Sequence, residues 1–205
     1  MTETEKTQAG YAEQVGAAGA SVKSGIVSSL RGIDEIEAEI VRVVRNTVSN
    51  TMKATGNVSQ EGVGTVRDVM KGAISATEEV GAGLVLATKS VAKGVIMGVS
   101  DVGGDVIGAA TETAKSAVTG AAEVGGDVAM VAKRAVDGIV EAARETGGNA
   151  ADLATAAANG AVEAASGIGK AAVTTVRDML VGVVSGIKDV AGTALPQKAG
   201  EPPQT

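Results

Sequence analysis

Hydrophobic residues recur in blocks of eleven from residue 59 to residue 190, without a gap between blocks. Positions one, four, five, eight and eleven of a block carry most of the valine, isoleucine, leucine and methionine. Eleven residues span three helical turns, so these positions share one arc of about 130° around a helix. A strand would need a period of two, which this stretch lacks. The pattern predicts amphipathic α-helices, and the last block places Leu180, Val183, Val184, Ile187 and Val190 on the apolar arc.

Charged residues follow the same period on the other face. Position nine is often basic, position ten is often acidic, and several lysines stand at position two, among them Lys93 and Lys115. Long basic stems at these places could lie along an apolar surface with their charged ends in water. A plain solvated face explains the charges equally well, and the two interpretations stay open.

The chain divides into four segments by composition. Residues 1–20 are predicted to be a flexible polar tail, and residues 21–55 an amphipathic helix. Residues 59–192 form the glycine-rich hendecad helices, and the proline-containing residues 193–205 are expected to be disordered.

Glycines have two competing uses in the repeat. In the first, glycine pairs end one helix and the next residue, Asp105, Asp127 or Asn149, caps the following helix. In the second, the helix continues and glycines four apart, such as Gly94 and Gly98, allow close packing of backbones. The candidate hinge or close-packing glycines are Gly103, Gly104, Gly125, Gly126, Gly147 and Gly148.

The composition argues against a compact globular core and against catalysis. The chain has no Cys, His, Trp or Phe, and Tyr11 is its single aromatic residue. Without cysteine or histidine, the usual zinc ligands and the commonest general base are missing. The glycine-rich stretches lack the lysine and hydroxyl residue of a phosphate-binding loop. We therefore expect no catalytic residues, metal, cofactor or small-molecule substrate.

Charge and hydropathy limit the partners and the location. The formal net charge of −6 disfavours nucleic acid, which selects a basic stripe. The start of the chain does not look like a secretory signal, and no uncharged apolar run approaches the roughly 20 residues that span a bilayer. We expect a cytoplasmic protein, peripheral to a membrane or to a lipid or polymer inclusion.

The blocks of eleven, taken singly or in pairs, resemble the lipid-surface helices of exchangeable apolipoproteins, perilipins and synucleins over about residues 26–190. The stretches SQEGV at 59–63 and AKGV at 92–95 are similar to the core of the synuclein repeat. This resemblance implies helices that fold on a membrane or droplet surface. The same period is similar to hendecad coiled coils, which imply a self-assembling bundle or filament. A third resemblance, to late-embryogenesis-abundant proteins, implies a stress protectant, but 44% hydrophobic residues is high for that class.

These observations predict an all-α protein of extended amphipathic helices with hendecad repeats and no compact globular core. Hairpins and a coiled-coil assembly both remain open. The expected function is non-enzymatic: the protein coats a membrane, lipid or other apolar surface and forms homo-oligomers, the alternatives being a filament or a stress protectant. The residues predicted to face the lipid or the partner are Val95, Ile96, Val99, Val106, Ile107, Val128, Ile139, Val140, Val173, Val176, Val183, Val184 and Ile187.

Overall fold

The computed structural model describes residues 32, 35–54, 62–80 and 83–194, except the side chains of residues 78–80 and 188–194. The chain divides into two units, Met1–Glu39 and Ile40–Thr205. The described residues of the first unit are helical. The tails predicted at 1–20 and 193–205 lie outside the described residues, apart from the helical residues 193 and 194.

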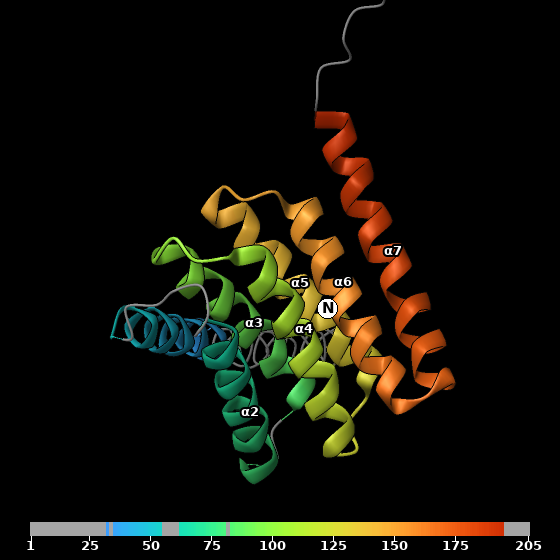
Figure 1. Ribbon diagram of the computed structural model, residues 1–205, viewed down its shortest axis with the longest axis horizontal. Coiled ribbons are helices and arrows are strands. Elements are labelled where there is room, and N and C mark those ends of the chain that lie inside the picture. The colour runs from blue at the N-terminus through green and yellow to red at the C-terminus, as the bar shows by residue number, and fades with distance from the viewer. Residues whose placement is uncertain (1–31, 33–34, 55–61, 81–82, 195–205) are drawn as a thin grey trace, which may run out of the picture. The chain divides into compact units, whose positions relative to one another are not determined.

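Helices make up nearly all of the described part of the second unit, where no strand occurs (Figure 1). Residues 40–54 are helical and precede six labelled helices. These are α2 (Gly62–Val80), α3 (Leu84–Asp101), α4 (Val106–Glu123), α5 (Val128–Thr146), α6 (Ala150–Ile168) and α7 (Lys170–Ala194). The prediction of an all-helical fold is confirmed.

Glycine ends α3, α4 and α5. Gly103, Gly125 and Gly147 have φ of 66°, 69° and 75°, a left-handed conformation that side chains with a β-carbon rarely adopt. The next glycine donates its N–H to a carbonyl five residues back, as Gly126 does to Ala121 at 2.7 Å. This arrangement satisfies carbonyls that the helix end would otherwise leave unpaired.

A side-chain cap then begins the following helix. The Oδ1 of Asp127 accepts hydrogen bonds from the N–H groups of Ala129 and Met130, at 3.1 and 3.0 Å. Asp105 and Asn149 cap α4 and α6 in the same way. The glycine pair and its capping residue thus recur in every second block and set helices of 18 or 19 residues.

Helices α2 to α6 each pack most closely on a helix two positions away. The most extensive contacts join α4 to α6 and α3 to α5, while sequential helices touch less. These pairs are parallel, because residues 89 and 93 of α3 approach residues 138 and 141 of α5 in the same order. Two interleaved stacks result, one of α2, α4 and α6 and one of residues 40–54, α3, α5 and α7.

A buried core lies between the stacks, and the expectation of extended helices without a core is not confirmed. Alanine and valine supply most of it, with Ile96, Ile139, Met52 and Met70 among its largest buried side chains. Small side chains let the helix axes approach closely, so the core fills without aromatic rings. The lack of aromatic residues was therefore not a reason to expect that the protein has no core. None of the described helices is long and apolar enough to cross a bilayer.

Candidate interaction surfaces

Glycines hold the parallel helix pairs in close contact. A β-carbon added to Gly138 of α5 would overlap the carbonyl oxygen of Lys89 in α3. Two blocks later, a β-carbon on Gly160 of α6 would overlap the carbonyl of Thr111 in α4. Only a hydrogen atom fits at these two positions, so the backbones of the paired helices are in direct contact.

A similar close contact, shifted by four residues, joins α3 to the helical residues 40–54. A β-carbon on Gly94 would stand 2.9 Å from the carbonyl oxygen of Val41, and one on Gly98 would stand 2.7 Å from that of Arg45. The side chains of Val44 and Val48 lie beside the two glycines. A pair of glycines four apart is thus covered by a helix that presents valines.

Gly94, Gly138 and Gly160 belong to a register that repeats in every second block, which we call the glycine register. Its members are Gly72, Gly94, Ser116, Gly138, Gly160 and Gly182. The first and last members differ from the interior ones, since Gly72 and Gly182 are exposed and a β-carbon there would meet nothing within 4 Å. The glycine register therefore continues on α2 and α7, where nothing lies within 4 Å of a β-carbon added to its glycine.

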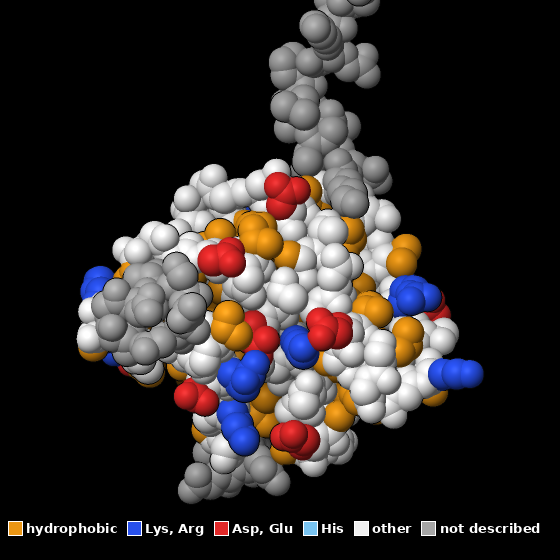
Figure 2. All heavy atoms as spheres, in the orientation of Figure 1, with side chains coloured by type: hydrophobic (Ala, Val, Ile, Leu, Met, Phe, Trp, Pro, Cys, Tyr) orange, Lys and Arg blue, Asp and Glu red, His pale blue; other side chains and the backbone are white. Residues whose placement is uncertain are grey.

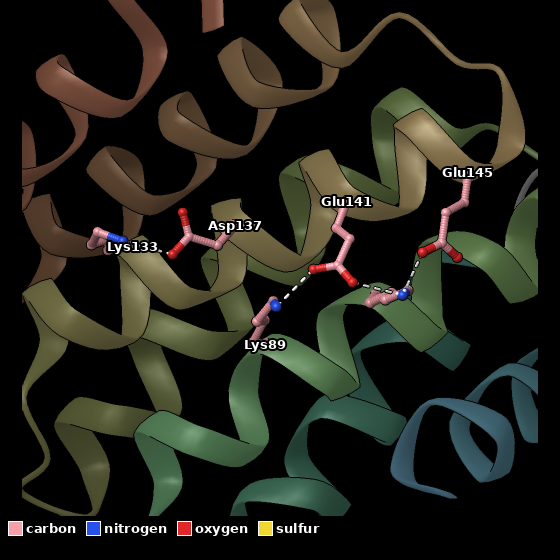
Figure 3. A network of polar contacts seen from close by, with 6 residues as sticks. Lys89, Lys133, Asp137, Glu141 and Glu145 are labelled. Atoms are coloured by element: carbon pink, nitrogen blue, oxygen red, sulfur yellow. Dashed lines mark hydrogen bonds and ion pairs between the residues drawn. The ribbon is translucent and has the colours of Figure 1, made fainter. Parts of the chain in front are cut away.

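Ion pairs join the same helices two positions apart. Lys93 of α3 bonds Glu141 and Glu145 of α5, each at 2.7 Å, and Lys89 bonds Glu141 at 2.7 Å (Figure 3). Lys115 of α4 bonds Glu163 of α6 at 2.6 Å, which repeats the Lys93–Glu141 pair two blocks later. These lysines stand at block positions two and nine, and their partners lie 48 to 52 residues away.

The pairs shift protonation equilibria in the expected directions. Hydrogen bonds from Lys89 and Lys93 hold the pKa of Glu141 below its ordinary 4.5. Arg45 bonds both carboxylate oxygens of Asp101, at 2.6 and 2.7 Å, and lowers the pKa of Asp101 below its ordinary 3.8. Both carboxylates are therefore charged at neutral pH and stabilise the helix pairs.

A pocket of about 280 Å³ with charged side chains in its wall lies between α2 and α4. Ser116, which stands in the glycine register, contributes to the wall, and the contacts between α2 and α4 are fewer than those in the α3–α5 and α4–α6 pairs. The wall also carries Arg67 and the buried Glu112, joined by a 2.9 Å ion pair, together with Lys71. Ser116 also donates its hydroxyl to Oε1 of Glu112, at 3.2 Å, so the same carboxylate oxygen binds both Arg67 and Ser116.

An apolar groove of about 540 Å³ lies between α6 and α7. Thr155, Ala158 and Val162 line it from α6, and Val181 and Val184 line it from α7. Val181 is 58% exposed, and hydrophobic atoms are visible along α7 on the face shown in Figure 2. The groove is larger than the pocket between α2 and α4 and carries less charge.

The residues predicted to face lipid or a partner lie mainly inside the protein. Six of them are buried in the core: Val95, Ile96, Val99, Ile139, Val140 and Val176. Five pack at the margin of the core: Val106, Val128, Val173, Val183 and Ile187. Ile107 is 43% exposed, and Val184 lines the groove. Only Ile107 is therefore exposed, and Val184, like the five residues at the margin, is partly buried.

The candidate glycines occupy the turns. Gly103, Gly125 and Gly147 hold the left-handed positions, and Gly104, Gly126 and Gly148 follow them. The glycines that allow close packing between helices are others, chiefly Gly94, Gly98, Gly138 and Gly160. Sequence reasoning did not single out Gly138 and Gly160 for this contact, although their regular spacing from Gly94 was the available signal.

Comparison of the chain with protein-family models, curated proteins and solved structures finds no match. The described residues include no group of three or more acidic side chains placed to hold a metal ion. The charged pocket between α2 and α4 and the apolar groove between α6 and α7 are the two candidate interaction surfaces.

Proposed function

We propose that this protein is a non-enzymatic structural protein that self-associates by continuing its own mode of helix packing. The observation that carries the proposal is the open groove between α6 and α7. In the interior pairs, the corresponding face of the earlier helix is covered by the helix two positions later. On α6 that face is only partly buried and borders the groove. Such a surface suits another helix of the same kind.

The charged side chains support association through helix packing rather than through recognition of a charged partner. Lys89, Lys115 and Arg45 bind carboxylates on neighbouring helices, which leaves them occupied in holding the stack. Figure 2 shows basic and acidic side chains mixed on one face, without a large patch of one sign. Mixed charge disfavours nucleic acid and steers no single class of charged partner.

Sedimentation equilibrium of the full chain between about 1 and 100 µM tests the proposal, a range that brackets micromolar association. We expect a mass above that of one chain at the upper end, together with strong helical circular dichroism in plain buffer. A chain that stays at 20.0 kDa throughout would contradict self-association.

Association with a lipid or other apolar surface is the second candidate, in keeping with a cytoplasmic, peripheral location. The exposed Val181 and Ile107, and Leu86 at 52% exposure, favour it as apolar groups already facing outward. Co-sedimentation with anionic phospholipid vesicles tests it. Binding without a gain in helix would indicate docking of the folded stack, whereas a large gain in helix would indicate that the predicted face opens onto lipid. Absence of binding would exclude this candidate for that lipid.

A further inference from the structure

We propose that two copies pair about a two-fold axis, with α7 of each copy lying in the α6–α7 groove of the other. In this arrangement Gly182 of one copy meets the backbone of α6 near Thr155 of its partner. The inference rests on the self-association proposed above, and it adds the partner, the helices and the contact residues.

The chain contains a copy of this contact in its interior. Gly182 and Gly186 of α7 lie eight blocks after Gly94 and Gly98 of α3, so the two pairs occupy the same positions of the repeat. In α3 the two glycines pack on the backbone at Val41 and Arg45, and valines fill the sides. In α7 the same two positions are exposed, and β-carbons there would meet nothing within 4 Å.

The receiving surface is repeated as well. Gly160 packs on Thr111 of α4, and the residue four blocks after Thr111 is Thr155 of α6. Thr155 lines the groove together with Val162, which stands four blocks after Val118. Val118 is buried in the core, whereas Val162 is only partly buried. The face that α6 covers on α4 is thus only partly covered on α6 itself.

The protein's own α7 does not use its glycine contact. By the glycine register, Gly182 would pack on Lys133 of α5, yet nothing lies within 4 Å of a β-carbon at Gly182. Helix α7 packs more extensively on α6 than on α5. The glycine face of α7 is therefore available to a helix from outside.

A two-fold axis satisfies the directions of the helices. Interior partners two positions apart are parallel, so an incoming α7 must run parallel to α6. Within one copy α6 and α7 run in opposite directions (Figure 1). The two α7 helices then oppose each other, as a perpendicular two-fold axis requires, and each copy gives and receives the same contact.

Two surface variants test the contact without disturbing the fold. Gly182→Leu and Val181→Lys replace exposed residues. The β-carbon of a leucine at position 182 would meet no atom within 4 Å. We expect each to weaken dimerisation at least about tenfold in sedimentation equilibrium, since a bulky or charged group separates the helices. Gly72→Leu is the matched control, because it has the same register and exposure on α2. We expect it to leave the dimer unchanged.

A charge pair tests the register. Asn159 and Ser185 are exposed and line the groove, and they stand four and two blocks after the ion-paired Lys115 and Glu163. The double variant Asn159→Lys with Ser185→Glu forms this pair twice across the two-fold axis and should dimerise about tenfold more tightly than wild type, each exposed ion pair being worth about threefold. Asn159→Lys with Ser185→Lys should dimerise more weakly than wild type.

The outcomes separate this inference from the proposed function. A wild type that is monomeric up to the highest concentration of the sedimentation series overturns both. A wild type that self-associates with unchanged affinity in Gly182→Leu and Val181→Lys overturns the α7 contact and leaves self-association standing. Equal affinities for the two charge variants overturn the register.

Discussion

Gly138 of α5 lies against the carbonyl of Lys89 in α3 so closely that no β-carbon fits between them. We expect Gly138→Ala to destabilise the fold by about 1–3 kcal/mol, because α5 must move away from α3. The loss exceeds the gain of about 1 kcal/mol that alanine brings to a helix. Chemical unfolding in urea measures the difference.

Gly72→Ala is the control for that prediction. Gly72 is helical and exposed, and a β-carbon there meets nothing within 4 Å. The variant should be more stable than wild type by about 0.5–1 kcal/mol, from helix propensity alone. Equal effects at 72 and 138 would show that close packing between α3 and α5 is unimportant.

Gly125→Ala should destabilise the fold by about 1–2 kcal/mol through the turn between α4 and α5. Its φ of 69° crowds a β-carbon against the following carbonyl. Gly125→Asn should lose less, since asparagine tolerates this conformation better. Thermal unfolding followed by circular dichroism would rank the three proteins, and an alanine variant as stable as wild type would refute the argument.

Asp127→Ala should cost about 1 kcal/mol of stability. The substitution leaves the N–H groups of Ala129 and Met130 without their acceptor at the start of α5. Asp127→Asn keeps an acceptor oxygen and should retain most of the stability, as Asn149 does at the start of α6. Urea midpoints for the two variants test this order, and equal losses of stability would show that the charge of Asp127 matters more than its acceptor oxygen.

Acid should weaken the pairing of α3 with α5. The pKa of Glu141 is lower in the folded protein than its ordinary 4.5, because Lys89 and Lys93 bind the charged form. Its contribution is therefore complete above about pH 4.5 and is lost as the pH falls through the folded value. Glu141→Gln should be less stable than wild type at neutral pH and should show a smaller loss between about pH 5 and 3. Parallel pH profiles for the two proteins would rule out this role.

The turns and helix lengths follow from local sequence. A glycine pair followed by Asp or Asn ends one helix and caps the next, so the motif at Gly125, Gly126 and Asp127 is readable without tertiary information. The groove could not be read in this way. The groove depends on the position that α7 takes beside α6. The glycines of α7 stand at the same block positions as those of α3, yet only the glycines of α3 are covered by another helix, so the repeat does not tell the two helices apart.

The sequence by itself determined that the chain is helical and which face of each helix is apolar, and it left turns or close packing as alternatives at the glycine pairs. Tertiary structure decided what covers that face: Ile139 and Val95 pack against other helices of the same chain. The physical reason is that burial of apolar surface has no direction and is satisfied equally by lipid, by another chain or by a neighbouring helix. Tertiary structure also selected the partners of charges such as Lys93, because Lys93 and Glu141, far apart along the chain, meet only when α3 and α5 stack.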